Sequence, residues 1–412
     1  MSRIINRCNS VKLFTILVFL IYPFAALPLI FIEIYNGKRY AYTLLAIYIG
    51  FFALLYPPAG DLYRYREDYL LYKNESFSTF ITLLALKLDF ILSFLLYLLS
   101  NLNVSCDFAR FIYTWIGSEL LLHIFYDMST NYRRQNPKRA FILFLIYWLY
   151  LNFIVLMYRH GLSSAFFAYG YYCLYYRNKK GIAGVMFILA ILNHFSYIVF
   201  VAGIIFQRLL KFEGNKWISL ACILFFLFCS FDMISSIIEK LPLPDYIQKH
   251  LLAYTNGFWA QEFLETQSLK NMILTWTNKF RLISLFSLYI LYYQKSNVSG
   301  FLTIATIILM LSNVSATISA RFEIAMLLPF LIFCFDLVIT QKISRYIIFK
   351  KAFMYIGMLY LFTSFWSHRR EYSISQEYKI FLPTSYNILS STYSQTWVDS
   401  HIDSKGEPIG LY

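Results

Sequence analysis

Charged residues are scarce in this chain of 412 residues: only 14% are Asp, Glu, Lys or Arg, whereas 59% are hydrophobic. A soluble domain is typically about 25% charged. The chain therefore lacks the polar residues that would cover a water-soluble globule, and the composition fits an integral membrane protein. Acidic residues are scarcer than basic ones, which gives a formal net charge of +14. Because the basic residues form short clusters between apolar segments, they are typical of cytoplasmic loops rather than of nucleic-acid binding.

Other absences exclude several classes of site. The six cysteines are scattered and no pair has metal-ligand spacing, so we interpret them as small buried residues rather than as disulfides or metal ligands. The sequence has no P-loop, no Gly-rich dinucleotide fingerprint and no zinc-protease helix. It also has no clear acidic metal motif and no internal repeat of the kind that many transporters show. We expect no metal and no cofactor.

Long apolar segments are what the chain does contain. The first, Leu13–Ile32, follows a basic N-terminus but is too long for a cleavable signal peptide and lacks a clean cleavage site, so we expect a retained first helix. The fold class we predict is all-α: a polytopic integral membrane protein with about 10–13 transmembrane or re-entrant helices. The further apolar spans are 41–57, 80–100, 108–127, 140–157, 162–176, 181–193, 195–210, 217–236, 276–293, 300–314, 322–339 and 347–366.

Charge indicates which loops stay in the cytoplasm. Four basic clusters predict cytoplasmic loops, at 133–139, 177–180, 207–216 and 341–351. The 237–275 loop and the polar tail 367–412 carry more acidic residues than basic ones and fit the opposite side.

The first part of the chain gives conflicting signals. Both the N-terminus and the loop with Lys38 and Arg39 are basic, and both cannot be cytoplasmic if Leu13–Ile32 crosses the membrane once. The side of 60–69 depends on whether 80–104 crosses the membrane or follows an interfacial course. Lys87 and Asp89 interrupt that segment.

Between the basic clusters 177–180 and 207–216 lie only about 26 apolar residues, too many for one upright helix and few for two full spans. Asn193 and His194 stand in the middle. We expect a short hairpin whose turn presents His194 toward the outer half of the membrane. The alternative is one long tilted helix with His194 bonded inside the bundle.

Four short polar motifs lie against apolar spans, where ionisable residues are a functional-site hypothesis by default. In the first, Asp61, Arg64, Tyr65 and Tyr69 are candidates for binding sugar hydroxyls, although a solvated loop in an aromatic belt would look the same. The motifs are GDLYRYREDY (60–69), YRHGLSSAF (158–166), ILNHFSYIVF (191–200) and SARFEIAMLLPF (319–330).

The other three motifs suggest phosphate binding and proton transfer. Arg159 and Arg321 each stand near the start of a span, where a planar guanidinium could hold a diphosphate bidentately. The alternative for Arg159 is an interfacial, snorkelling side chain. His160 and His194 are candidates for proton transfer because imidazole titrates near neutral pH.

The order and chemistry of these motifs resemble the EpsG family of bacterial polysaccharide polymerases, which are related in function to the O-antigen (Wzy-type) polymerases. The resemblance covers roughly residues 12–366, and it departs from the family pattern at Leu62 and at His160, where the family usually has Tyr and Gln. The matching residues are Gly60-Asp61-Leu62-Tyr63-Arg64-Tyr65, Asp89-Phe90 with Tyr97-Leu98-Leu99, Arg159-His160-Gly161-Leu162-Ser163, Asn193-His194-Phe195-Ser196 and Arg321-Phe322.

The resemblance implies an enzyme of the inner (cytoplasmic) bacterial membrane that joins undecaprenyl-diphosphate-linked oligosaccharide units without a nucleotide sugar or a metal. Residues 1–366 would form the membrane polymerase domain, with outer loops near 58–79 and 237–275. Arg159 and Arg321 would hold the diphosphate. His194, Asp61 or His160 would act on the acceptor hydroxyl, and Tyr65, Tyr69 and Arg64 would contact sugars. A chain-length regulator and a flippase are expected partners, and nucleic acid is not.

Two other functions fit the same features. A flippase for lipid-linked oligosaccharides would use the arginines to hold a diphosphate during translocation. A membrane acyltransferase would modify the glycan and leave its chain length unchanged.

Overall fold

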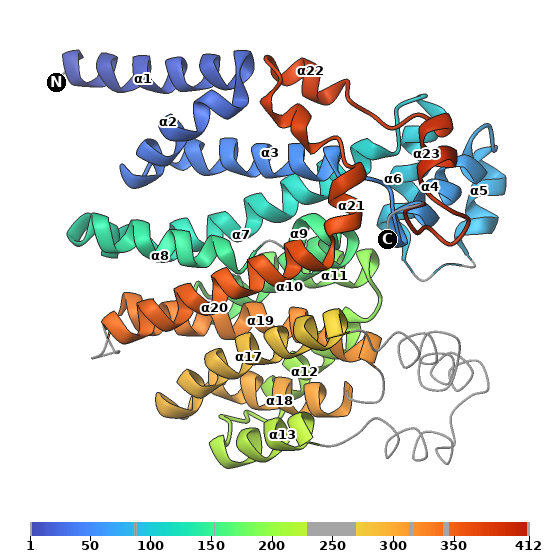
Figure 1. The fold of residues 1–412 in the computed structure, drawn as a ribbon. Helices are drawn as coiled ribbons and strands as arrows, with labels where there is room; N and C mark the ends of the chain where they lie inside the picture. The colour runs from blue at the N-terminus through green and yellow to red at the C-terminus, as the bar shows by residue number, and fades with distance from the viewer. Residues whose placement is uncertain are drawn as a thin grey trace, which may run out of the picture. The chain divides into compact units, whose positions relative to one another are not determined.

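The computed structural model describes residues 2–85, 87, 89–151, 153–228, 269–312, 316–340 and 346–409. These residues form helices and connecting loops, with one isolated β-bridge between Ile402 and Pro408, which confirms the all-α prediction (Figure 1). The chain divides into two compact units. Unit 1 comprises Met1–Tyr169, Ile188–Phe195 and His368–Tyr412, and unit 2 comprises Gly170–Phe187 and Ser196–Ser367.

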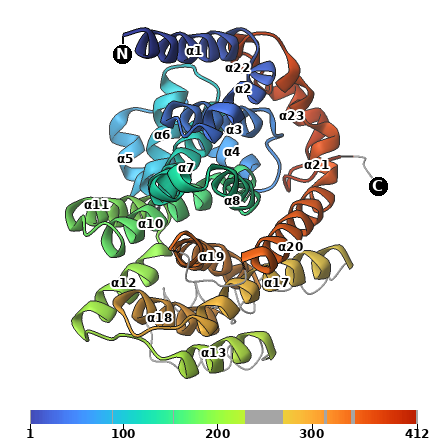
Figure 2. The same ribbon diagram turned by 90° about the vertical axis from the view of Figure 1, so that its left-hand side faces the viewer.

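Unit 1 is built around two long helices, α3 (Arg39–Leu55) and α7 (Asp107–Gln135), which lie side by side in both ribbon views (Figures 1 and 2). Arg133, near the end of α7, donates to Tyr42 Oη at the start of α3, at 3.0 Å. At the opposite end Arg110, near the start of α7, donates to the Tyr56 carbonyl just after α3. The two helices are therefore antiparallel.

The first apolar run is not the single span that the sequence suggested. It breaks at Tyr22, and Pro23 begins a second helix because proline suits a first helical position. The run therefore forms α1 (Ser2–Ile21) and α2 (Pro23–Tyr35), which pack together and run in opposite directions (Figure 1).

The break resolves the conflict over the first loop. Lys12 Nζ lies 5.7 Å from the ring centroid of Tyr40, so the middle of α1 lies beside the start of α3. The loop at Gly37 is so close to Arg133 that an added Cβ would meet Arg133 Nε at 2.5 Å. The two basic segments thus lie at one end of unit 1, together with 133–139. We call this the basic end.

The opposite end of unit 1 is where α1 and α3 stop and α7 starts, and we call it the motif end. Three short helices gather there: α4 (Asp61–Tyr72), α5 (Phe77–Leu84) and α6 (Phe90–Asn101). The apolar segment 80–100 is therefore two short helices. At 1.5 Å per residue the 12 residues of α6 reach about 18 Å, less than the roughly 30 Å of a hydrocarbon core. This length favours the interfacial or re-entrant course over a full span.

The chain then runs from the basic end back to the motif end. It passes through α8 (Pro137–Leu149) and α9 (Phe153–Leu156) and begins α10 (Tyr158–Tyr175) beside the first turns of α7, where the rings of Tyr158 and Tyr113 lie 5.3 Å apart. After α11 (Lys180–Asn193) the helix stops, and α12 (Tyr197–Leu209) starts four residues later. The alternative of one long helix through His194 is therefore wrong.

The polar tail is folded onto the motif end. It forms α21 (Arg369–Ile374), the 3₁₀ helix η2 (Glu377–Phe381), α22 (Ser385–Leu389) and α23 (Gln395–His401). Ser385 Oγ donates to the Phe19 carbonyl at 3.0 Å, and Gln376 N donates to the Leu55 carbonyl at 3.2 Å. The tail therefore caps the ends of α1 and α3.

Unit 2 contains α12, α13 (Lys216–Phe228), α17 (Leu269–Leu291), α18 (Asn297–Leu311), α19 (Ala316–Ile339) and α20 (Tyr346–Ser367). Its helices pack closely at small residues. A Cβ on Gly203 of α12 would meet Ile304 and Ile308 of α18 at 3.1 Å. Helix α17 packs against both α19 and α20. Most of the expected outer loop 237–275 lies outside the described residues.

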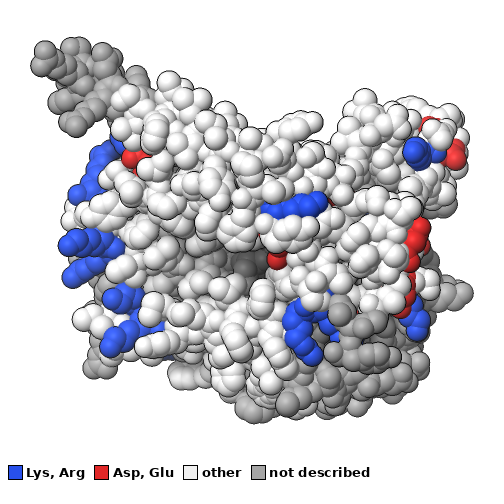
Figure 3. Space-filling view, turned by 45° about the horizontal axis from the view of Figure 1, so that its top comes forward, with Lys and Arg blue, Asp and Glu red and all other residues white. Residues whose placement is uncertain are grey.

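Two stretches of the described residues, Pro137–Val155 and Ile318–Ile339, are long and apolar enough to cross a membrane, and eight other apolar helices have 10–17 residues. Large apolar side chains are nevertheless exposed along the helices, including Leu13, Leu209 and Phe362 at 58, 76 and 68%. In the view of Figure 3 most of the visible surface is uncharged and the charged side chains form separate groups. The number of membrane crossings stays a prediction.

Candidate functional site

Arg159 is the centre of a polar cluster at the motif end of unit 1. It lies in the first turn of α10, where Gly161 lets the helix start close to α9: an added Cβ would meet the Ile154 Cα at 3.0 Å. Arg159 Nη1 lies 2.7 Å from Asp89 Oδ2, and the guanidinium carbon lies 5.1 Å from the ring centroid of Tyr65. The side chains of Arg159 and Asp89 are each 21% exposed, so solvent reaches this ion pair.

Three tyrosines from three helices support the guanidinium. The ring of Tyr65 on α4 packs edge-on against Tyr158, with centroids 5.4 Å apart, and Tyr158 packs in the same way against Tyr113 on α7. Tyr113 is 2% exposed, and its hydroxyl finds no hydrogen-bond partner among the described residues. Edge-to-face contacts of this kind fix ring orientation, so Tyr65 is held in place over Arg159.

The two predicted histidines meet beside this cluster. The rings of His160 and His194 lie 5.4 Å apart at an interplanar angle of 75°, and both side chains are buried. Asn193, which is fully buried, donates from Nδ2 to the Arg159 carbonyl at 2.9 Å and to Ser163 Oγ at 2.7 Å. The last residue of α11 is thereby joined to the first turn of α10, and this connection brings the histidines together.

Asp89 joins the second motif, which contains Arg159, to the third, which contains His194. Besides its ion pair with Arg159, its Oδ1 accepts a hydrogen bond from the Phe195 backbone N–H at 2.9 Å. Phe195 follows His194 in the break between α11 and α12. The Asp89 carboxylate therefore binds both Arg159 and the turn that carries His194. The sequence offered Asp89 as a charge interrupting an apolar segment and as part of the family resemblance, but it assigned this residue no role in the site.

The first motif forms α4 and divides its candidates between two environments. Asp61 and Arg64 pair with each other at 3.5 Å and are 52 and 45% exposed, and Asp61 is among the charges that act on Arg159. Tyr65 and Tyr69 both pack against the apolar cluster that contains Leu62 and Leu96, and Tyr65 also lies against the Arg159 guanidinium. Sugar binding by Arg64, Tyr65 and Tyr69 stays a prediction.

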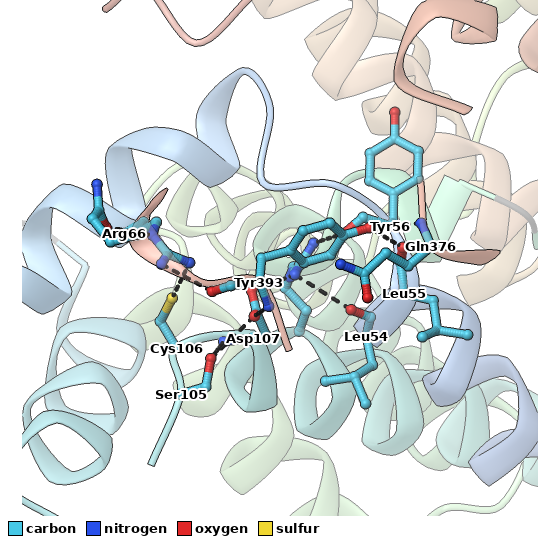
Figure 4. Close-up of polar contacts among 11 residues, drawn as sticks. Leu54, Leu55, Tyr56, Arg66, Ser105, Cys106, Asp107, Gln376 and Tyr393 are labelled. Atoms are coloured by element: carbon cyan, nitrogen blue, oxygen red, sulfur yellow. Dashed lines mark hydrogen bonds and ion pairs between the residues drawn. The ribbon is translucent and has the colours of Figure 1, made fainter. Parts of the chain in front are cut away.

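Arg66, which the sequence did not single out, anchors α4 to the C-terminal tail (Figure 4). It is buried and donates to Gln395 Oε1 at 3.1 Å, to the Tyr393 carbonyl at 3.0 Å and to Cys106 Sγ at 3.7 Å. Gly60, at the start of α4, has φ +60° and donates to the Gly406 carbonyl at 2.8 Å. The tail therefore fixes the helix that carries Tyr65.

A buried ion pair adjoins this contact. Asp107 pairs with Arg110, and the two side chains are 1 and 5% exposed. Asp107 Oδ2 also accepts from the Tyr393 N–H at 2.8 Å, and the Tyr393 hydroxyl donates to the Leu55 carbonyl (Figure 4). Burial raises the pKa of the neighbouring Cys106 thiol to about 12, so this cysteine stays protonated. These buried contacts are structural, because they hold Tyr393 of the tail against the start of α7 and the end of α3.

Arg321 belongs to unit 2, in α19 two residues before Glu323. Glu323 is buried, and the charges that act on it are those of Lys279 and Arg281. Arg281 is 2% exposed and its guanidinium carbon lies 3.6 Å from the ring centroid of Tyr360. The sequence did not predict a role for Arg281 or Glu323. A joint role for Arg159 and Arg321 stays a prediction.

The arrangement around Arg159 can bind an anion and move a proton. The guanidinium is held on an aromatic face and is partly exposed to solvent, and guanidinium groups match phosphate geometry bidentately. Two imidazoles lie in the adjacent turn. Among the described residues no group of three or more His, Cys, Asp or Glu side chains could hold a metal ion.

Comparison with known proteins assigns the chain to a family. No curated protein and no solved structure matches it. A family model, that of the EpsG family, matches residues 38–379, which is most of the chain. Members of this family are Wzy-type polymerase-like glycosyltransferases. The match includes α4, Asp89 and the Arg159, His194 and Arg321 motifs, and the chain therefore belongs to the EpsG family.

Proposed function

We propose that this protein polymerises undecaprenyl-diphosphate-linked oligosaccharide repeat units at the outer face of the bacterial inner membrane. The product would be a surface polysaccharide, namely an O-antigen, a capsule or an exopolysaccharide. Family membership supports a polymerase-like glycosyltransferase. The observation that carries the proposal is the partly exposed Arg159 beside the buried pair His160 and His194.

The two ends of unit 1 support an outward-facing site. Arg3, Arg7, Lys12, Lys38 and Arg39 belong to its basic end, with the cluster 133–139. Basic loops stay in the cytoplasm. The Arg159 cluster is at the motif end, which would therefore face the outer side, where lipid-linked repeat units are joined.

The reaction exchanges one C–O bond for another. A sugar hydroxyl of the incoming lipid-linked unit attacks the anomeric carbon of the growing glycan. The bond between that carbon and the diphosphate oxygen breaks, and undecaprenyl diphosphate leaves with the bonding electron pair. The hydroxyl proton passes to a base. No oxidation or reduction occurs, and the glycan grows at the end that is attached to its lipid carrier.

The residues divide these tasks by their chemistry. Arg159, with Arg321 as its proposed partner, offsets the charge that develops on the departing diphosphate, an electrostatic role of the kind that dominates many enzymes. His194, or alternatively His160 or Asp61, takes the acceptor proton. Tyr65, Tyr69 and Arg64 contact the sugars. A flippase that supplies the units and a regulator of chain length would be its partners.

The test is the glycan ladder of a strain that lacks this protein, complemented with wild type, Arg159→Ala or Arg370→Ala. Arg370 is an exposed arginine of α21 at the same end of unit 1 and serves as the matched control. We expect the ladder to collapse to a single repeat unit in the deletion strain. Wild type and Arg370→Ala should restore it, and Arg159→Ala should not.

Other patterns would contradict the proposal. Loss of all surface glycan, single units included, would favour a flippase. An unchanged ladder with altered acyl content would favour an acyltransferase. A full ladder from Arg159→Ala at equal protein level would remove Arg159 from the mechanism.

A further inference from the structure

Asp89 occupies the start of α6 without capping that helix. An aspartate at this position normally accepts hydrogen bonds from the first backbone N–H groups of its own helix. Here the side chain makes no such bond. Its Oδ2 contacts Arg159 Nη1 at 2.7 Å and its Oδ1 accepts from the Phe195 N–H at 2.9 Å. The carboxylate is therefore directed at the candidate anion site.

A second Arg–Asp pair in unit 1 shows what a permanent ion pair looks like in this protein. Asp107 and Arg110 are 1 and 5% exposed, and Arg110 also donates to the Tyr56 and Leu54 carbonyls. The Asp89–Arg159 pair is 21% exposed on both sides. Breaking the sealed pair would leave buried charges unpaired, which is strongly unfavourable. The open pair can exchange partners with a ligand that reaches it from solvent.

Carboxylate and phosphate oxygens bind the same fork of guanidinium N–H groups. We propose that Asp89 is the resident anion of Arg159 and that the diphosphate of the lipid-linked substrate takes its place. This inference rests on the proposed function, to which it adds one feature: a carboxylate that competes with the diphosphate for Arg159. The exchange requires an anionic ligand, because a neutral group cannot compensate the guanidinium when Asp89 leaves. Asp89 thereby selects for diphosphate over neutral lipids and sugars.

The exchange keeps part of the site in place. The bond from the Phe195 N–H to Asp89 Oδ1 does not involve Arg159, so the carboxylate can stay joined to the turn that carries His194. The guanidinium carbon stays over the Tyr65 ring when the N–H groups exchange Asp89 for phosphate. The substrate then binds to a guanidinium that is already oriented.

The experiment compares binding of undecaprenyl diphosphate to the purified full-length protein in detergent, followed by tryptophan fluorescence. Removing the competing charge with Asp89→Asn should lower the Kd about tenfold, equivalent to about 1.4 kcal/mol. Asp89→Glu retains the charge and should stay within about twofold of wild type. Glu67→Gln removes one charge from an exposed position on α4 and is the matched control, with an unchanged Kd.

Three further measurements test the inference. Neutral undecaprenol should bind wild type and Asp89→Asn equally, because it does not compete for Arg159. Asp89→Ala should tighten diphosphate binding as Asp89→Asn does, which separates charge removal from any effect of the asparagine amide. In the polymerisation assay the same variants should lower the KM for the lipid-linked substrate.

Weaker or unchanged diphosphate binding by both Asp89→Asn and Asp89→Ala would overturn the inference and make Asp89 a residue that merely orients Arg159. Loss of binding in Arg159→Ala with tighter binding in Asp89→Asn is the pattern that supports it. Failure of wild type itself to bind undecaprenyl diphosphate would overturn the proposed function, and the inference with it.

Discussion

Arg66→Ala should release the C-terminal tail from α4. Arg66 is buried and donates to two acceptors on the tail, Gln395 Oε1 and the Tyr393 carbonyl. The alanine leaves both acceptors without this donor. Gln395 is exposed and water can replace the donor there, but the Tyr393 carbonyl is buried, and an unsatisfied buried group is unfavourable by about 1–3 kcal/mol. Each 1.4 kcal/mol is a factor of ten, so the open population should rise at least about 5-fold.

Limited proteolysis of the purified full-length protein measures this opening. Cleavage within 382–409 should accelerate strongly in Arg66→Ala, while cleavage elsewhere stays at the wild-type rate. Arg64→Ala is the matched control, because Arg64 stands on the same helix but is 45% exposed. Equal cleavage rates in wild type and Arg66→Ala would refute the anchoring role of Arg66. They would also remove the argument that the tail fixes α4.

Three further predictions concern other contacts. Tyr65→Ala removes the ring stacked on Arg159, an interaction of about 0.5–2 kcal/mol, so the KM for the lipid-linked substrate should rise roughly 2- to 30-fold while Tyr65→Phe stays near wild type. Asn193→Ala removes two hydrogen bonds of about 0.5–1.5 kcal/mol each, and the apparent unfolding temperature should fall. Burial raises the pKa of Glu377 from 4.5 to about 7. Its protonated form therefore stabilises the tail fully below pH 4.5 and this contribution is lost as pH rises through 7. Wild type should accordingly be cleaved faster at pH 8 than at pH 6, and Glu377→Gln should show a smaller difference.

The motifs that the sequence singled out do meet in part. Four of these residues converge at the motif end: Asp89, Arg159, His160 and His194. They do so because Asn193 donates to the Arg159 carbonyl in the first turn of α10 and Asp89 accepts from the Phe195 N–H in the turn that follows α11. The break at His194 was predictable, since the apolar run was too long for one helix and too short for two full spans. The Asp89–Arg159 pair joins residues 70 positions apart. Periodicity cannot report such a contact.

Three features escaped the sequence for physical reasons. Hydropathy treats 13–32 as one apolar run, and only the start of a new helix at Pro23 shows that the chain turns back. Arg64 and Arg66 are equivalent by composition, yet the tail, more than 320 positions later, buries one and leaves the other exposed. Which of two neighbouring arginines is structural depends on a distant segment. For the same reason, the sequence could not identify Arg281 and Glu323 as buried residues of unit 2.

The most direct test of a polymerase is reconstitution with a single purified component. The full-length protein in liposomes, supplied only with undecaprenyl-diphosphate-linked repeat units, should produce lipid-linked glycans of two, three and more units. One undecaprenyl diphosphate should be released for each bond formed, and Arg159→Ala should release almost none. Movement of intact units across the bilayer without any lengthening of the glycan would contradict the account.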